Sequence, residues 1–487
     1  MDESQLATQG DLELLAEDTV QVRDSQVRPT NITTAGDLLI LGEEGVDATT
    51  VNTASGIENL DTEGEITVSG DNVSLSTAIT APEGNVTITG SRVALLDGTN
   101  IDVSADTSGG DIFIGTEAYP NTTNNNQTAL RTYIAPEASL SADALTNGDG
   151  GQVIVWADEV AGFYGNISSR CVAEDGDGGF VEVSGQQHLL FRGDVDVNAV
   201  NGESGTLLLD PTDIIIAAGN GDEAGDGPDT FQGNNSEIVG SVLSAPLSTF
   251  DDEPTTIFES ELEALSGDTG VILQATNDII IQDLIETFGP GVLRFKRGTG
   301  RIELIADADG DGSGSVRMED VQDRIQSRGR DLVISGHDVV LGDISTSPSV
   351  ELYEPELEDS GTITITGSGY ITVGNINTYI TSFSYETLAS NLAGNGGAFD
   401  IEGVEQIIIG DINTSNIAAA NFDGTSGDSL EVLAGNGGAI TITGSDSITV
   451  GNLRSDSLAT TYASLYGSTT GAAGIISSAG KGGNILI

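Results

Sequence analysis

The chain has 487 residues, a length that allows about three ordinary globular domains or one elongated array of repeats. It carries 76 Asp and Glu but 16 Lys and Arg, and this formal net charge of -60 excludes nucleic acid and anionic membrane surfaces as partners, while cations remain suitable. Hydrophobic residues make up 37% of the chain and come in clusters of Val, Ile and Leu, which excludes a disordered acidic polymer.

The first twenty residues, MDESQLATQGDLELLAEDTV, contain neither the basic segment nor the apolar core of a secretory signal peptide. No run of about 18 apolar residues occurs anywhere in the sequence, so no membrane insertion is expected. Cys171 is the single cysteine, which excludes an intramolecular disulfide and a cysteine-based metal cluster. We expect Cys171 to be a small buried side chain.

A short β-rich phrase recurs in the first half of the chain. Its copies are AGDLLIL from Ala35, GEITVSG from Gly64, GNVTITG from Gly84, GGDIFIG from Gly109, GGQVIVWA from Gly150, GGFVEVSG from Gly178 and SGTLLLDP from Ser204. Aliphatic and polar residues alternate within them, which predicts strands with one buried face. The first four copies start about 20 to 30 residues apart, the length of one coil in a solenoid.

The middle of the chain breaks this pattern. Residues 217–256 contain GNGDEAGDGPD and DDEP and have a weak strand signal, so they are predicted to form an irregular acidic insertion or a break. This assigns 1–216 to one β-helix segment and 257–487 to its continuation. Strong helix formers occur only in brief stretches such as 260–265 and 317–325, which disfavours alternating βα domains.

The last third repeats a longer phrase: SGTITITGSGYITVGN from Ser360, GGAFDIEGVEQIIIGD from Gly396 and GGAITITGSDSITVGN from Gly437. Their first shared glycines are 36 (361 to 397) and 41 (397 to 438) residues apart, and a fourth copy begins 45 residues later (438 to 483). Each copy predicts two strands separated by a turn. The segments between copies, 379–395, 418–436 and 458–481, vary in length and are predicted to be loops that leave one side of the solenoid.

Three all-β architectures suit short strands with Gly, Asn and Asp turns: a parallel β-helix, tandem β-sandwiches, or a propeller. Trp156 is the single Trp, so the recurring Trp-Asp of a propeller is missing, and aromatic residues total 5%, which is few for sandwich domains that usually have an aromatic centre in each core. We therefore predict an all-β parallel β-helix with loop excursions. Ile, Val and Leu would stack inside it, with Thr and Ser outside and Gly or Asn at the corners.

One segment also resembles a known family. Residues 109–217, with GGDIFIG, TYIAPEASLSADALTNGDGGQVIVWADEVAGFYGNIS, GGFVEVSGQQHLLFRGDVDV and GTLLLDPTDIIIA, resemble the passenger region of filamentous haemagglutinin-like large exoproteins of Gram-negative bacteria. The resemblance implies a right-handed parallel β-helix that is exported by an outer-membrane two-partner secretion transporter and acts as a secreted or cell-surface adhesin. The family's amino-terminal secretion domain has no counterpart here, so we expect an internal piece of a longer protein.

The sharpest chemical motif is DADGDGSGS. It places Asp307, Asp309 and Asp311 at positions 1, 3 and 5 of a calcium loop and Gly312 at position 6, where alternate carboxylates converge on a hard cation. Position 12 is Met318 where a bidentate Glu is expected, and the flanks RIELIA and SVRME are typical of strands. A calcium site and a solvated acidic turn both remain open.

The other candidate motifs have structural explanations. Arg192 to Asp194 spell RGD, a tripeptide that some adhesins use to engage integrins, but Gly and Asp are expected in a turn. His188 and His337 each lie beside a strand-like run and are far apart in sequence, so we expect structural roles.

These features predict a structural or adhesive exoprotein, not an enzyme, that contacts a host or neighbouring cell surface or a polysaccharide in a biofilm. One alternative is a calcium-stabilised extracellular matrix protein. The other is a β-helical polysaccharide lyase or hydrolase, which the scarcity of Lys disfavours for anionic substrates.

Overall fold

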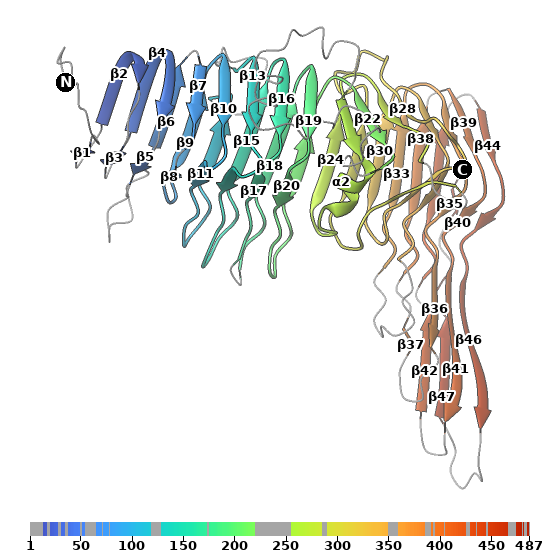
Figure 1. Ribbon diagram of the computed structural model, residues 1–487. Helices are drawn as coiled ribbons and strands as arrows, with labels where there is room; N and C mark the ends of the chain where they lie inside the picture. Colours follow the sequence, from blue (N-terminus) through green and yellow to red (C-terminus); the bar gives the residue numbers. More distant parts are fainter. Residues whose placement is uncertain are drawn as a thin grey trace. The chain divides into compact units, whose positions relative to one another are not determined.

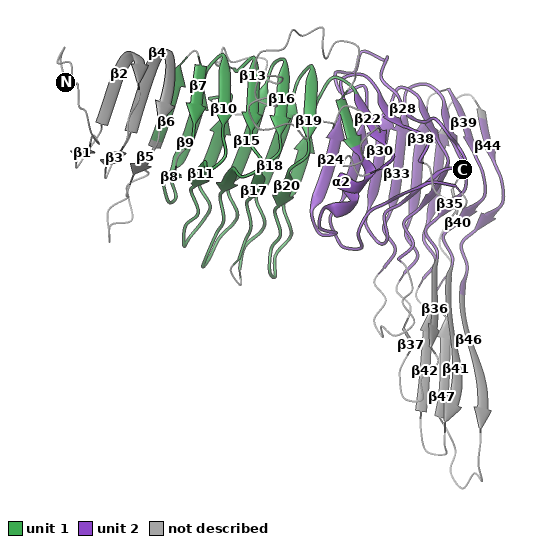
Figure 2. Cartoon of the chain, viewed as in Figure 1, with its two compact units in different colours: residues 1–213, 221–257 green, residues 214–220, 258–487 purple. Residues whose placement is uncertain are grey.

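The chain forms two compact units, one of residues 1–213 with 221–257 and one of 214–220 with 258–487 (Figure 2). Each is a parallel β-helix, which confirms the predicted fold class. The computed structural model describes residues 65–117 except 71 and 77, 128–172, 175–219, 255–284, 290–348, 359–384, 391–392, 395–403, 405–424, 429–434, 436–444, 447–465, 474–479, 481 and 485–486, together with five strands within 13–53. Residues 220–254, most of the predicted insertion at 217–256, lie outside this part.

The first unit consists of three ladders of parallel strands, and the chain passes through the ladders in turn as it winds around each coil (Figure 1). Ladder 1 contains β4 (Leu38–Ala48), β6 (Glu65–Gly70), β9 (Asn85–Thr89), β12 (Asp111–Ile114), β15 (Gln152–Ala157), β18 (Phe180–Gly185) and β21 (Thr206–Leu209), with β2 (Val20–Val27) paired to β4. Ladder 2 contains β7 (Asn72–Leu75), β10 (Arg92–Leu95), β13 (Arg131–Ile134), β16 (Val160–Phe163) and β19 (His188–Phe191). Ladder 3 contains β1 (Glu13–Ala16), β3 (Asn31–Thr34), β5 (Val51–Thr53), β8 (Ala78–Thr80), β11 (Asn100–Asp102), β14 (Ser139–Ser141), β17 (Asn166–Ser168) and β20 (Asp194–Asp196).

Identical positions of successive coils stack to form the core. In ladder 1 the register aligns a column of aliphatic side chains, all fully buried: Ile66, Val86, Ile112, Val153, Val181 and Leu207. The β-branched residues fit the pleated surface of a strand, and burial of each such side chain contributes about 1.5–3 kcal/mol. The alternation seen in the sequence thus fixes the register, because a shift by one residue would expose the whole column.

The second unit has three ladders of the same kind. Ladder 4 contains β24 (Gly270–Gln274), β27 (Ile302–Ile305), β30 (Leu332–Gly336), β33 (Ile363–Gly367), β38 (Phe399–Gly403), β43 (Ile440–Gly444) and β48 (Ile485–Leu486). Ladder 5 contains β22 (Ile214–Ala217), β25 (Ile279–Ile281), β28 (Val316–Met318), β31 (Val339–Leu341), β34 (Ile371–Val373), β39 (Gln406–Ile409) and β44 (Ser447–Val450). Ladder 6 contains β26 (Val292–Arg294), β29 (Arg324–Gln326), β32 (Asp343–Ser345), β35 (Ile376–Asn377), β40 (Ile412–Asn413) and β45 (Leu453–Arg454).

The repeat predicted from the sequence is the length of one coil in this unit. Strands of ladder 4 start 36 (363 to 399), 41 (399 to 440) and 45 (440 to 485) residues apart. The segments between repeats differ from the prediction, because they contain strands and not only loops. β36 (Ile380–Ser384), β41 (Asn416–Gly424) and β46 (Ser457–Leu465) pair in one parallel ladder, and β37 (Asn391–Leu392), β42 (Ser429–Ala434) and β47 (Gly474–Ala479) in another. Successive excursions leave the coil at equivalent places, so their backbones come within pairing distance.

Helical structure is confined to a short segment in the described residues. The stretch at 260–265 forms α2 (Glu259–Ala264), which follows β23 (Thr255–Phe258) and buries Leu262. The stretch at 317–325 instead contains the end of β28, a turn and the start of β29. Across the described residues, α2 falls well short of the length and apolarity that a membrane-spanning helix requires.

Candidate functional site

The predicted calcium loop lies in the turn between β27 and β28. One carboxylate oxygen each from Asp307, Asp309 and Asp311 lies within 4.8 Å of the others, so the structure brings the three predicted residues together. The carboxylates also hold the turn: the amide N–H of Gly312 donates to Asp307 Oδ1 at 2.9 Å, and that of Asp311 donates to Asp309 Oδ1 at 3.3 Å. Both strands flanking the turn agree with the sequence interpretation, and calcium binding itself stays a prediction.

Met318, at the twelfth position of that loop, does not face the turn. Its side chain is 4% exposed and its Sδ accepts a hydrogen bond from the amide of Gly342 at 3.3 Å. Residue 318 is therefore part of the core, and the loop does not have the complete ligand set of an EF-hand.

A second acidic group, Asp283, Asp320 and Asp323, was not recognised in the sequence because 40 residues separate its ends. Asp323 is 2% exposed, and its two carboxylate oxygens accept hydrogen bonds from the amides of Leu284 at 2.8 Å and Gly291 at 2.6 Å. Asp323 thus satisfies buried backbone donors on both sides of residues 285–289.

Many other acidic residues form ladders of side chains along the coil corners. In one, the amide of Asn375 donates to Asp343 Oδ1 at 2.7 Å, that of Asp411 donates to Asn375 Oδ1 at 3.0 Å, and that of Asn452 donates to Asp411 Oδ1 at 2.7 Å. The hydrogen bonds that Asn452 donates from its backbone amide and its side chain lower the pKa of the Asp411 carboxyl. A second ladder joins Asp359, Asn395, Asn436 and Lys481 in the same way. Part of the acidic composition therefore serves to cap amides where the strands end.

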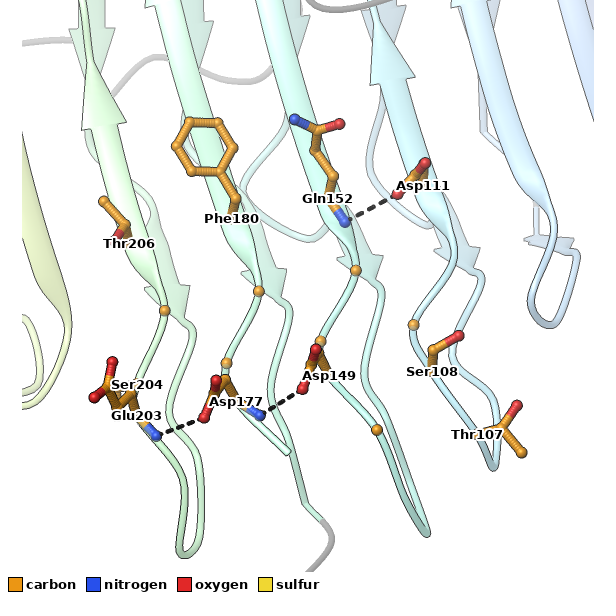
Figure 3. Close-up of a pocket in the computed structure, with 17 residues that line it drawn as sticks. Thr107, Ser108, Asp111, Asp149, Gln152, Asp177, Phe180, Glu203, Ser204 and Thr206 are labelled. Carbon is orange, nitrogen blue, oxygen red and sulfur yellow. Dashed lines mark hydrogen bonds between the residues drawn. The ribbon is translucent and has the colours of Figure 1, made fainter. Parts of the chain in front are cut away.

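A groove of about 750 Å³ crosses four coils of the first unit, at the edge where the strands of ladder 1 begin (Figure 3). Asp111, Gln152, Phe180 and Thr206 are aligned by strand register and form one row of side chains along it. Asp149, Asp177 and Glu203 form a second row on the preceding corners. The amide of Asp177 donates to Asp149 Oδ1 and that of Glu203 to Asp177 Oδ1, both at 2.8 Å.

Glycine pairs lie between the two rows. A Cβ at Gly151 would lie 1.9 Å from the carbonyl oxygen of Gly110, and one at Gly179 would lie 2.1 Å from that of Gly151. The backbones of neighbouring coils approach too closely here for any side chain. The rows on both sides carry side chains, whereas the strip between them consists of glycines except at Ser204, which makes the groove. The recurring GG of the sequence is the signal that could have located it.

The remaining sequence candidates occupy coil corners or the core. In the RGD segment, Arg192 Nη1 donates to the carbonyl oxygens of Phe191 and Thr256, and Asp194 begins β20. Cys171 is buried, as predicted, and its backbone forms isolated parallel β-bridges with Ala144 and Ala199 of the adjacent coils. His188 is buried in the first unit, whereas His337 in the second hydrogen-bonds through Nδ1 with Ser368 Oγ at 2.8 Å.

Arg170, Asp194 and Asp196 border a hollow of about 260 Å³ on ladder 3, and Arg170 also contacts the buried Asp143. Arg170 Nη2 lies 2.7 Å from Asp143 Oδ2 and its Nη1 lies 3.7 Å from Asp196 Oδ2. Asp143 is 4% exposed and also accepts from the amide of Arg170 and from Ser168 Oγ. Its oxygens are occupied by these donors, an arrangement that suits a clamp between coils better than a general base.

No model of a known protein family matches the chain, and no curated protein is significantly similar to it.

Proposed function

We propose that this chain is a structural and adhesive exoprotein that presents its β-helical surface to host cells, neighbouring cells or polysaccharide. The observation that carries the proposal is the repeated polar outer face of ladder 3. There Asn100, Ser139, Asn166 and Asp194 form one row and Asp102, Ser141, Ser168 and Asp196 a second, on either side of buried aliphatic residues. Such a repetitive surface suits an extended or multivalent partner better than a small substrate.

The resemblance of residues 109–217 to exported haemagglutinin-like passengers supports the same proposal. It also leads us to propose a secreted or cell-surface location and export by an outer-membrane two-partner secretion transporter. The net charge of -60 is compatible with a soluble exposed surface.

Adhesion is tested with the purified chain coupled to beads, which are offered to bacterial cells, host cells and polysaccharide-coated surfaces. The control is an unrelated folded protein of similar negative charge, because charge alone changes attachment. We expect retention above this control on at least one surface. Retention equal to the control on all of them would remove the adhesive part of the proposal. Reducing ends released from neutral or uronate glycans would instead support the hydrolase or lyase alternative.

A calcium-stabilised matrix protein is a second candidate, favoured by the three converging carboxylates of Asp307, Asp309 and Asp311. A cation that binds the folded state alone raises the unfolding midpoint by mass action. Thermal unfolding is measured with calcium and with chelator at equal ionic strength, in the wild type and in Asp309→Asn/Asp311→Asn. A rise with calcium that the double variant lacks would support the site. An identical response of both proteins would reject it.

A further inference from the structure

The groove of the first unit offers more than a general adhesive surface. We propose that it binds an extended, uncharged polysaccharide along the direction in which the coils stack. This inference rests on the proposed adhesive function and names both the partner and the part of the molecule that holds it.

The spacing of the groove is the first argument. Its side chains repeat once per coil, a step of about 4.8 Å. This step is close to the length of one sugar ring in an extended β-linked chain, so successive rings would meet successive coils. An extended peptide returns a side chain to the same face only every two residues, about 6.7 Å, and would lose register over four coils.

The side chains of the groove are the second argument. A sugar ring has hydroxyl groups around its rim and C–H groups on its faces. Gln152 can donate to and accept from hydroxyls, the carboxylates of Asp149 and Asp177 accept from them, and the half-buried ring of Phe180 can pack against a C–H face. Because Asp149 and Asp177 are each held by an amide of the next coil, their acceptors are fixed before a ligand arrives.

Charge selects between kinds of polysaccharide. The side chains along the groove include the carboxylates of Asp111, Asp149, Asp177 and Glu203 and no Lys, Arg or His. A uronate or sulfated chain would place like charges beside these carboxylates, which is unfavourable. An uncharged chain can use them as strong acceptors. The same carboxylates would also attract a cationic peptide, which the experiment therefore includes.

Binding is measured by affinity electrophoresis and calorimetry with the whole chain and four soluble probes: a β-linked glucan, an uncharged galactomannan, alginate and poly-lysine. We expect one or both uncharged polysaccharides to bind and alginate not to bind. Binding of poly-lysine without either uncharged chain would overturn the inference in favour of a cationic peptide. Binding of none of the probes would reject the groove as a glycan site.

Two variants locate the site. Phe180→Ala and Gln152→Ala remove partly exposed side chains, and each is expected to weaken binding roughly tenfold, the loss that corresponds to one aromatic or hydrogen-bonded contact. Tyr370→Ala is the matched control, since Tyr370 is an exposed aromatic residue of the second unit, 53% accessible. Unchanged thermal unfolding verifies that each variant is folded. If Tyr370→Ala weakens binding and the two groove variants do not, the assignment to the groove is wrong.

The inference and the adhesive proposal fail separately. If beads carrying the wild type adhere to cells but no uncharged polysaccharide binds, adhesion stands and the groove inference falls. If polysaccharide binds and the variants lose it, yet beads adhere to no surface, the groove is a glycan site and the adhesive proposal falls.

Discussion

Glu182 is a carboxylate that lies within β18 where water hardly reaches it. Its side chain is 2% exposed, and the strand register places it between Ile154 and Leu208 of the neighbouring coils. Oε1 accepts a hydrogen bond from Ser184 Oγ at 2.9 Å, while Oε2 has no hydrogen-bond partner within the described part of the chain. Burial raises the pKa of Glu182 from 4.5 to about 7, and the nearby charge of Asp210 adds to this. Ionisation of Glu182 therefore destabilises the folded state.

Glu182→Gln should stabilise the protein in a pH-dependent way. The folded-state pKa of Glu182 lies above the unfolded one, so wild-type stability decreases as pH rises from about 4.5 to about 7 and the loss is complete above that range. The variant avoids this loss, which amounts to at most about 3 kcal/mol. Urea unfolding at pH 8 and pH 5 measures it: we expect a clear gain at pH 8 and little change at pH 5. A gain of equal size at both pH values, or the same pattern in the exposed control Glu319→Gln, would contradict this explanation.

At the scale of the element, the ladders of Asp and Asn side chains connect successive coils in addition to the pairing of the strands. A strand ends where its amide donors lose their backbone partners, and in the second unit the side chain one coil earlier accepts from that amide. The ladder through Asp343, Asn375, Asp411 and Asn452 repeats this contact three times. Asp and Asn are interchangeable in the ladder because each offers a side-chain oxygen to the next coil.

Removal of one acceptor should loosen the next corner only. In Asp411→Ala the amide of Asn452 loses its carboxylate partner, so its hydrogen exchange should accelerate, while amides in β43 remain protected. Asp411→Asn keeps an acceptor and should leave exchange nearly unchanged. Because the folded-state pKa of Asp411 is lowered, wild-type protection at this corner should also fall as pH drops below about 4. Uniform acceleration across the second unit would show that the ladder acts globally.

At the glycine pairs, we expect an added side-chain atom to destabilise the protein. Gly151→Ala would place a methyl group 1.9 Å from the carbonyl oxygen of Gly110, so the two coils must separate. Overpacking of this kind costs about 1–3 kcal/mol, measured as a fall in the free energy of unfolding. Gly336→Ala is the matched control, because its nearest neighbour, the carbonyl oxygen of Gly314, is 3.3 Å from the added atom. Equal losses in both variants would mean that the close approach of coils at Gly151 is not the cause.

Some elements of this fold can be predicted from the sequence and others cannot. Alternation in GNVTITG or GGQVIVWA specifies a strand and its buried face because both follow from a local period of two. The paired glycines are a local sign of the groove, but their significance depends on the close approach of Gly151 to Gly110, which joins residues 41 positions apart (110 to 151). The strands β41 and β42 were predicted as part of a loop, since their pairing depends on an equivalent excursion in the next repeat. Asp307 to Asp311 were predicted as a cluster because five consecutive positions contain all three carboxylates.

At the scale of the whole molecule, the net charge of -60 sets a cost that the corner ladders only partly reduce. Hydrogen bonds from Asn452 stabilise the charged form of Asp411, but this carboxylate still repels the other acidic groups around it. The folded chain holds these charges closer together than the unfolded chain does. Screening should therefore favour the folded state.

Thermal unfolding in sodium chloride tests this directly. Between about 0.01 M and about 1 M salt the screening length falls from roughly 30 Å to roughly 3 Å, and we expect the midpoint to rise through this range and then level off. Unfolding midpoints in calcium and in sodium at equal ionic strength separate screening from site binding. Screening alone should give the two salts the same midpoint apart from the effect of ion valence. A site at Asp307, Asp309 and Asp311 should instead give a rise that saturates at low calcium. A midpoint that is independent of sodium chloride would mean that repulsion among the carboxylates does not limit this fold, and that bound cations or the stacked aliphatic columns outweigh it.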